Sequence, residues 1–268
     1  IETLNNFDRE KPFCLLYFHK APHRNWMPDS KHLTMYDGVE IPMPETFFDD
    51  YQTRSNAARD QDMEVINLYN SFDMKIHSIG KEEEYSGGNE AFRKKASENW
   101  QRLYNSLTNE QRKLWDSAYE PKNRAFLEAN LSGIELAKWK YQRYIKDYLR
   151  CVASVDDNIG RLLDYLDEHG LTENTVVIYT SDQGFYLGEH GWYDKRFMYE
   201  ESLGMPLIIR YPQEISAGMT LDEMVLNLDF CPTILDYAGV EVPAEIQGES
   251  LRSLLRGHPS PQWRQMIY

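Results

Sequence analysis

The sequence predicts an α/β fold in which helices cover both faces of a mostly parallel central sheet. Two observations lead to this prediction. A long amphipathic pattern runs through residues 134–169, and short apolar runs at 13–18, 175–181 and 205–212 precede and follow it. Because strands that alternate with helices commonly form parallel βαβ units, we expect these runs to share one sheet.

The helix at 134–169 is predicted from its periodicity. Apolar side chains recur there at spacings of three and four residues, which places them on one face of a helix. His169 lies in the last turn, and Gly170 after it supplies a common stop signal. The apolar positions are Tyr148, Val152, Val155, Ile159, Leu162 and Leu166.

The strands are predicted from their apolar and β-branched composition. The run 13–18 (FCLLYF) is typical of a buried strand, and 175–181 (TVVIYTS) is typical of a central one. The run 205–212 (MPLIIRYP) predicts a further strand. Each run is therefore expected to pair with neighbours in the core.

The remaining segments are more polar. Residues 53–70 show weak helical spacing, and a short helix is expected to end near Gly239. Residues 76–130 are polar and charged, and we expect them to form an excursion on the core instead of a separate domain. Within it, Thr108 followed by Gln111 fits a helix capping box.

Composition excludes several classes of function. The chain has 29 Lys and Arg against 43 Asp and Glu, a formal net charge of −14. Such an acidic protein is poorly suited to nucleic acid or to anionic membranes. No apolar run approaches the roughly 18 residues of a membrane span. The three cysteines, Cys14, Cys151 and Cys231, show no C-x-x-C spacing and predict neither a disulfide framework nor a zinc site.

Asp182 and Gln183 follow the strand predicted at 175–181, at the edge where open α/β sheets bind ligands. Both side chains offer oxygen acceptors, which suit a hard cation such as Ca²⁺ or Mg²⁺. A Ca²⁺ site needs roughly 6–8 oxygens, so other ligands must come from elsewhere. The alternative is a strand-end turn capped by Asp182. Three glycines allow the following loop to fold tightly: Gly184, Gly188 and Gly191.

Basic and imidazole side chains gather in two loops. His190 and Lys195 follow the glycine-rich turn, and a second group comes directly after the run at 13–18. A histidine can donate a proton near neutral pH, and a lysine can hold an anionic oxygen. The alternative for each is a solvated or structural side chain. The second group comprises His19, Lys20, His23 and Arg24.

Three stretches together resemble the sulfatase family of the alkaline-phosphatase-like superfamily. TSDQGFYLGEHGWYDKRFMYEES (180–202) is similar to the second metal-binding motif of that family. KPFCLLYFHKAPHRNW (11–26) resembles the motif that carries a catalytic histidine, and VLNLDFCPTILDYAGV (225–240) resembles a late Asp-x-x-Pro-Thr helix. The resemblance implies an alkaline-phosphatase-like α/β fold and hydrolysis of sulfate esters.

The resemblance also implies roles for individual residues. Asp182 and Gln183 would bind Ca²⁺, which is expected in preference to Mg²⁺. Lys195 would hold a sulfate oxygen near the ester bridge, and His23 would protonate the leaving alcohol. His190 would face the substrate. Lys20 and Arg24 would lie at the rim of the pocket.

The nucleophile of the family is a formylglycine made within Cys/Ser-x-Pro-x-Arg, and this motif does not occur in the sequence. We therefore expect residues 1–268 to be the C-terminal part of a catalytic domain, incomplete at both ends, with a C-terminal subdomain only begun or absent. The missing N-terminal part of the domain would supply the formylglycine, and the fragment alone would be inactive.

The expected substrate is a sulfated glycan, with resemblance to bacterial enzymes that act on 6-sulfated N-acetylhexosamine of glycosaminoglycans. The family also implies a periplasmic, secreted or cell-surface protein. Two alternatives remain open. One is a phosphonate monoester or phosphodiester hydrolase of the same superfamily, and the other is a non-catalytic glycan-binding domain.

Overall fold

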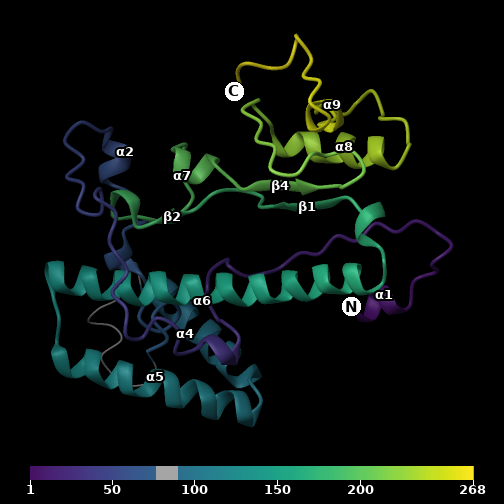
Figure 1. Ribbon diagram of the computed structural model, residues 1–268. Helices are drawn as coiled ribbons and strands as arrows, with labels where there is room; N and C mark the ends of the chain where they lie inside the picture. The colour runs from purple at the N-terminus through teal and green to yellow at the C-terminus, as the bar shows by residue number, and fades with distance from the viewer. Residues whose placement is uncertain (77–89, 268) are drawn as a thin grey trace. The chain divides into compact units, whose positions relative to one another are not determined.

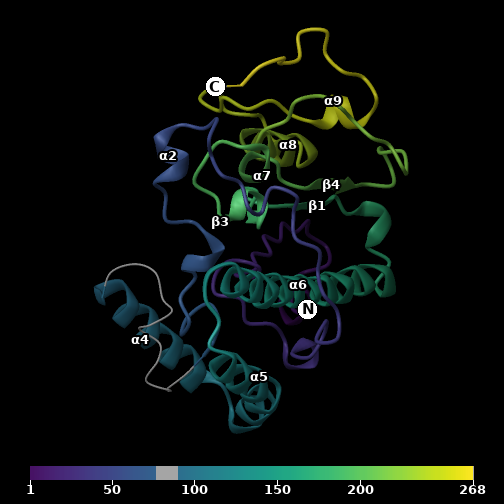
Figure 2. The same cartoon turned by 90° about the vertical axis from the view of Figure 1, so that its left-hand side faces the viewer.

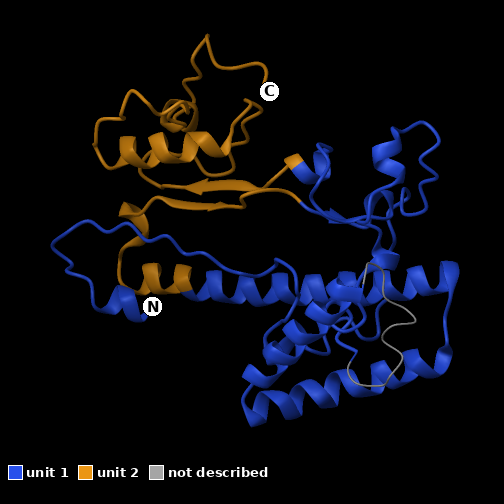
Figure 3. Cartoon of the chain, turned by 180° about the vertical axis from the view of Figure 1, so that it is seen from behind, with its two compact units in different colours: residues 1–161, 185–202 blue, residues 162–184, 203–268 orange. Residues whose placement is uncertain are grey.

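The chain divides into two compact units, which Figure 3 colours separately. The computed structural model describes residues 1–76 and 90–267. None of the helices in these ranges is both long and apolar enough to cross a membrane. Units 1 and 2 consist of residues 1–161 with 185–202, and of residues 162–184 with 203–268, respectively.

Unit 1 is mainly helical (Figure 1). Its helices are α1 (Glu2–Asn5), α2 (Asn56–Arg59), α4 (Glu90–Ser106), α5 (Asn109–Ala129), the part of α6 (Gly133–Glu168) up to Arg161, and α7 (Glu200–Leu203), which ends at the unit boundary. Its 3-10 helices and its two-stranded hairpin are η1 (Ser30–His32), η2 (Val65–Asn67), η4 (Glu189–Gly191), β2 (Tyr186–Leu187) and β3 (Tyr193–Asp194).

Helix α6 confirms the prediction at 134–169, and Gly170 after it has φ +66°. The buried face agrees in part with the predicted one, because Val155 and Leu166 are buried whereas Val152 is 38% exposed. The core of unit 1 forms instead around the N-terminal half of the helix, where Tyr141 and Tyr144 pack with Trp26. Aromatic side chains bury large areas, so this cluster anchors the loops that precede α2.

Helix α5 runs beside α6 in the views of Figures 1 and 2. Polar side chains form part of their contact: the Asp147 carboxylate, fully buried, accepts hydrogen bonds from Tyr119, Arg150 and Lys75. Burial alone would raise the pKa of Asp147, but the surrounding positive charges, first that of Lys75, lower it. The buried carboxylate is thus held ionised.

The predicted excursion at 76–130 falls partly outside the described residues, which omit 77–89. Its described part forms α4 and α5. The capping box at the start of α5 is confirmed, since Thr108 Oγ1 accepts from Gln111 N and Gln111 Oε1 accepts from Thr108 N.

Unit 2 contains η3 (Thr172–Asn174), β1 (Val177–Thr180), β4 (Leu207–Arg210), η5 (Asn227–Asp229), α8 (Phe230–Tyr237) and α9 (Arg252–Leu255). Its core brings Leu207 and Ile209 against Leu254 of α9. On the other face of the ladder, the register pair Tyr179 and Ile208 is exposed. The strands therefore show the alternation of a sheet with one buried face.

Three expectations from the sequence are corrected. The strands that the structure pairs are antiparallel, β1 with β4 and β2 with β3. Residues 13–18 form no strand and are largely exposed, because no described strand pairs with them. The weak helical spacing at 53–70 yields only α2 and η2, since nucleation makes short isolated helices unfavourable.

Candidate functional site

Lys20 and His23 form a close pair just after the extended segment 13–18. Lys20 Nζ lies 2.7 Å from His23 Nδ1 and donates to the carbonyl oxygen of Arg24 at 2.9 Å. His23 Nδ1 also lies 2.7 Å from that carbonyl oxygen. Because a carbonyl oxygen only accepts, this second contact needs a proton on Nδ1, and a ring protonated on both nitrogens also carries one on Nε2. The exposed ring can then donate a proton to a ligand.

Lys195 lies near this pair. Desolvation and the positive charge of Lys195 lower the pKa of Lys20, which places the two ammonium groups within electrostatic reach. Lys195 Nζ also lies 5.7 Å from the centre of the Phe185 ring. Lys20 and His23 therefore lie together as a basic pair suited to an anion, and the positive charge of Lys195 acts on Lys20.

Arg24, predicted for the pocket rim, binds a buried carboxylate and lies against three aromatic rings. Its Nε and Nη2 donate to Asp73 at 2.6 and 2.5 Å, and its guanidinium lies over the rings of Tyr69, Phe72 and Tyr193. Burial alone would lower the pKa of Arg24, but the Asp73 carboxylate raises it. The side chain fixes the backbone carbonyl that Lys20 and His23 contact.

His190 forms a second polar cluster in unit 1. Its Nδ1 lies 2.9 Å from Asp49 Oδ2, which also accepts from Arg54 Nη2 at 2.9 Å. Burial alone would raise the pKa of Asp49, but hydrogen bonds from Tyr51 N, His190 and Arg54 lower it to about 2. His190 Nε2 lies 3.9 Å from Glu201 Oε1. The imidazole is thereby oriented through Nδ1.

Asp49 is a residue of this cluster that the sequence analysis did not identify. Its side chain is only 15% exposed and pairs with a histidine 141 positions away. The sequence offers no local signal for such a pair. Only the folded contact between the loop before α2 and η4 reveals it.

Backbone geometry holds η4 in place. Gly188 has φ +112°, and a Cβ there would lie 2.6 Å from Tyr141 Cε2. Gly191 has φ +74°, and a Cβ there would lie 2.8 Å from the carbonyl oxygen of Phe47. The tight glycine loop predicted from sequence is confirmed at these two positions. The Tyr51 hydroxyl completes the anchor by donating to the backbone carbonyl of His190.

Asp182 and Gln183 belong to unit 2 and follow β1, as predicted. The turn folds on the Ser181 hydroxyl, which donates to Gln183 O at 2.8 Å and lies 3.4 Å from Asp182 Oδ1. Asp182 is exposed and Gln183 half-buried. Across residues 1–76 and 90–267, no three His, Cys, Asp or Glu side chains gather as a metal-binding group. The two oxygen-bearing side chains fit part of a hard-cation site.

The chain matches two family descriptions. Residues 33–203 match type I phosphodiesterase / nucleotide pyrophosphatase, and residues 188–268 match the C-terminal region of N-sulphoglucosamine sulphohydrolase. The second match begins within the glycine-rich loop that carries His190.

Two curated relatives are similar over different shares of the chain. N-acetylglucosamine-6-O-sulfatase of Bacteroides thetaiotaomicron is 47% identical over 100% of this chain and 47% of its own length. Human N-acetylglucosamine-6-sulfatase is 39% identical over 41% of this chain and 20% of its own length. The chain spans about half the length of the Bacteroides relative, and its match to the human relative covers 20% of that protein.

A solved structure is also similar. It is a protein in complex with its substrate D-glucosamine-2-N,6-O-disulfate, 46% identical to this chain, with a TM-score of 0.88. The match covers 98% of this chain and 52% of the other. The backbone described above therefore corresponds to about half of that solved chain.

Proposed function

The chain belongs to the sulfatase family of the alkaline-phosphatase-like superfamily, and on this premise we propose that the protein containing it removes sulfate from a sulfated carbohydrate. The membership confirms the α/β fold class expected from the sequence. The proposed substrate is a 6-sulfated N-acetylhexosamine of a glycosaminoglycan. The names of the Bacteroides and human relatives and the sulfated glucosamine in the solved complex support this choice.

The observation that carries the proposal is the contact of His23 with Lys20, whose pKa is lowered by burial and by the positive charge of Lys195. Lys195 would neutralise a sulfate oxygen, where negative charge shifts during cleavage of the ester. His23 would donate the Nε2 proton to the leaving alcohol, an effect typically worth about 10²–10⁴ in rate. In the imidazolium form, Nδ1–H would donate to the Arg24 carbonyl oxygen, which leaves the Nε2 proton available for the alcohol.

His190 is proposed to contact the sugar or the bridging oxygen through Nε2. Its Nδ1 is held by Asp49, so the ring has a fixed orientation toward a ligand. Arg24, bound by Asp73, is proposed to shape the pocket rim by ordering the backbone beside His23.

Asp182 and Gln183 are proposed to hold Ca²⁺. Their oxygen donors suit this ion, and no described lysine, arginine or histidine pairs with Asp182. When bound, Ca²⁺ would supply positive charge against the sulfate oxygens. The further ligands and the formylglycine are proposed to lie in parts of the protein outside this chain. We also propose a periplasmic, secreted or cell-surface location, as in the extracellular sulfatases similar to this chain.

The test uses the full-length protein and its His23→Ala variant. Wild type should release sulfate from N-acetylglucosamine 6-sulfate. The variant should lose far more activity on this sugar than on nitrophenyl sulfate, because a phenolate leaves without protonation. Equal losses on both substrates would remove His23 as the acid. If the wild type released no sulfate from either substrate, the proposed function would be rejected.

The metal proposal has its own measurement. Ca²⁺ should raise the thermal unfolding temperature of the metal-stripped full-length protein, because an ion that binds only the folded state stabilises it. Asp182→Asn should raise the Ca²⁺ concentration required for the shift. An unchanged dependence in this variant would exclude Asp182 as a ligand.

A second candidate activity is phosphonate monoester or phosphodiester hydrolysis. The match of residues 33–203 to type I phosphodiesterases favours it. Relative turnover of nitrophenyl sulfate and nitrophenyl phosphonate by the full-length protein separates the two activities. Preference for the phosphonate would replace the sulfatase proposal.

A further inference from the structure

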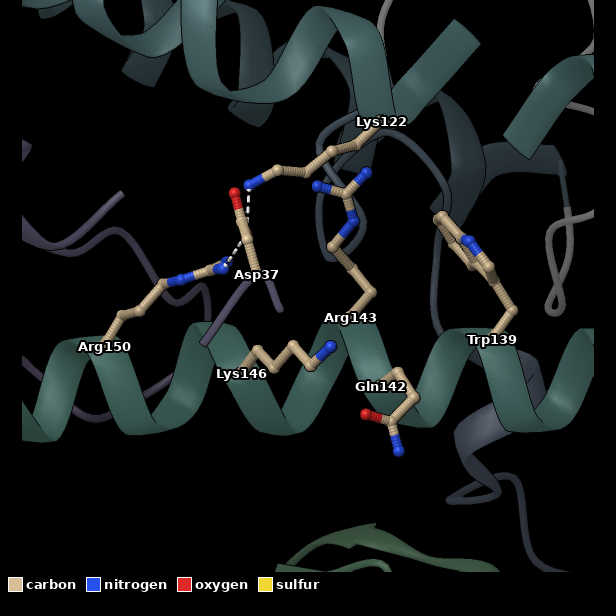
Figure 4. A pocket seen from close by; sticks show the side chains of 7 residues that line it. All are labelled: Asp37, Lys122, Trp139, Gln142, Arg143, Lys146 and Arg150. Atoms are coloured by element: carbon tan, nitrogen blue, oxygen red, sulfur yellow. Dashed lines mark hydrogen bonds and ion pairs between the residues drawn. The ribbon is translucent and has the colours of Figure 1, made fainter. Parts of the chain in front are cut away.

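A cationic cavity lies between α5 and α6 in unit 1, and the proposed hydrolase function makes no use of it. Its volume is about 300 Å³, at the lower end of the range typical of small-ligand sites. Figure 4 shows four cationic side chains and one carboxylate among its lining residues: Lys122, Arg143, Lys146, Arg150 and Asp37.

Arg143 is one of two buried arginines that line this cavity, with 6% of the residue exposed. Its Nη2 donates to Asn123 Oδ1 at 2.6 Å, whereas its Nη1 has no hydrogen-bond partner among the residues that the structure describes. The guanidinium points from α6 toward α5 (Figure 4). A buried donor without a partner is destabilising, so this group is suited to an acceptor from outside the chain.

The carboxylates nearby are shared among several cations. Asp37 accepts from both Lys122, at 2.7 Å, and Arg150, at 2.6 Å. Arg150 also binds Asp147, and that carboxylate already pairs with a fully buried lysine. Lys146 forms no ion pair with any described carboxylate. Positive charge therefore exceeds negative charge along this wall.

The electrostatics agree with an excess of positive charge. Burial lowers the pKa of Lys122, Arg143 and Lys146, and the positive charge of Arg150 lowers each of them further. Nearby carboxylates raise these values but do not restore them. The chain as a whole carries a formal net charge of −14, so this excess of positive charge is local. A bound anion would relieve both the repulsion and the desolvation.

We propose that this cavity binds a tetrahedral oxyanion, either free or carried as a sulfate group on a sugar. Arg143, Lys122 and Lys146 offer several charge-assisted hydrogen-bond donors around one cavity. Such an arrangement favours the oxygens of sulfate and phosphate. The proposal does not depend on the hydrolase function. Sulfate release can succeed or fail in the same protein whatever this cavity binds.

The test is calorimetric titration of the full-length protein with sodium sulfate at constant ionic strength. Lys195→Ala is present throughout, so that the proposed catalytic contact does not contribute. Adding Arg143→Met should weaken sulfate binding by about tenfold or more, since a hydrogen bond to a charged group is worth about 1.5–3 kcal/mol. Lys138 of the same helix, whose side chain is 42% exposed, serves as the control, and Lys138→Met should leave binding unchanged.

Lys146→Met is a milder variant in case loss of Arg143 impairs folding, and it should weaken sulfate binding several-fold. Glucosamine 6-sulfate and glucosamine identify the source of the anion. Tighter binding of glucosamine 6-sulfate than of sulfate assigns the cavity to a glycan, and equal binding assigns it to the free ion. Unchanged sulfate affinity in both variants, no binding of either anion, or equally tight binding of glucosamine overturns the proposal.

Discussion

Arg24 and Asp73 form a two-point ion pair in unit 1, with Nε and Nη2 of the guanidinium each 2.6 Å or less from a carboxylate oxygen. Asp73 is fully buried, and its Oδ2 also accepts from Tyr69 N at 2.8 Å. The carbonyl of Arg24 is in turn the acceptor for Lys20. The pair therefore links a buried anchor to the residues proposed to act on the ester.

Asp73→Ala should destabilise the protein by about 3 kcal/mol, because it leaves a largely buried guanidinium without its carboxylate. Denaturant unfolding measures this change. The double variant Arg24→Met/Asp73→Ala should recover part of the loss, since the unpaired charge is then gone. A double variant less stable than Asp73→Ala would show that Asp73 acts mainly through other contacts.

The contact between Asp49 and His190 should make the free energy of unfolding depend on pH in the acid range. The folded pKa of Asp49 is about 2 against an ordinary 3.8, so its contribution is present above 3.8 and is lost as pH falls toward 2. Asp49→Asn should remove this part of the pH dependence of unfolding and lower stability at neutral pH. The exposed neighbour provides the control: Asp50→Asn should retain the wild-type profile.

The sequence could predict what depends on neighbouring residues. The periodicity of 134–169 and the capping box at Thr108 are local features, and both elements formed as expected. The run 13–18 has the composition of a strand, but a strand needs a hydrogen-bonding neighbour, which the run itself cannot specify.

The same distinction between local and long-range features applies to the candidate site. The histidine and lysine positions could be inferred from the motif stretches, and Lys20 and His23 do lie side by side. Asp49 and Asp73 could not, because each acts through a partner far away in the chain. Ion pairs over such separations depend on the whole fold, and no local pattern encodes them.

Lys140 should make stability depend on pH in the alkaline range. Its ammonium is buried and donates to the carbonyl oxygens of Ile66 and Leu68, and burial lowers its pKa to about 7 from 10.5. The folded state thus binds fewer protons than the unfolded state between these values. Stability should therefore rise as pH increases from about 7 to 10.5.

Lys140→Met should flatten that rise when unfolding is followed across the same pH range. Lys138→Met changes an exposed lysine two positions away and should preserve it. A rise of equal size in Lys140→Met would mean that other groups, and not this buried ammonium, produce the alkaline dependence.

Gly191 should tolerate no side chain, and its replacement tests how rigidly η4 holds His190. A Cβ at this position meets the backbone oxygen of Phe47 at 2.8 Å, and φ of +74° adds strain for any other residue. Gly191→Ala should therefore cost about 1–3 kcal/mol in the free energy of unfolding, which denaturant unfolding measures.

Gly160 is a contrasting control, because it lies inside α6 and no atom outside the helix backbone comes within 4 Å of the place that a Cβ would take. Gly160→Ala should stabilise the protein by up to about 1 kcal/mol, since alanine favours a helix more than glycine does. Equal effects of the two substitutions on denaturant unfolding would show that the loop around His190 adapts freely. Opposite signs would instead show that the close approach of Phe47 to Gly191 holds η4, and with it the imidazole, in one place.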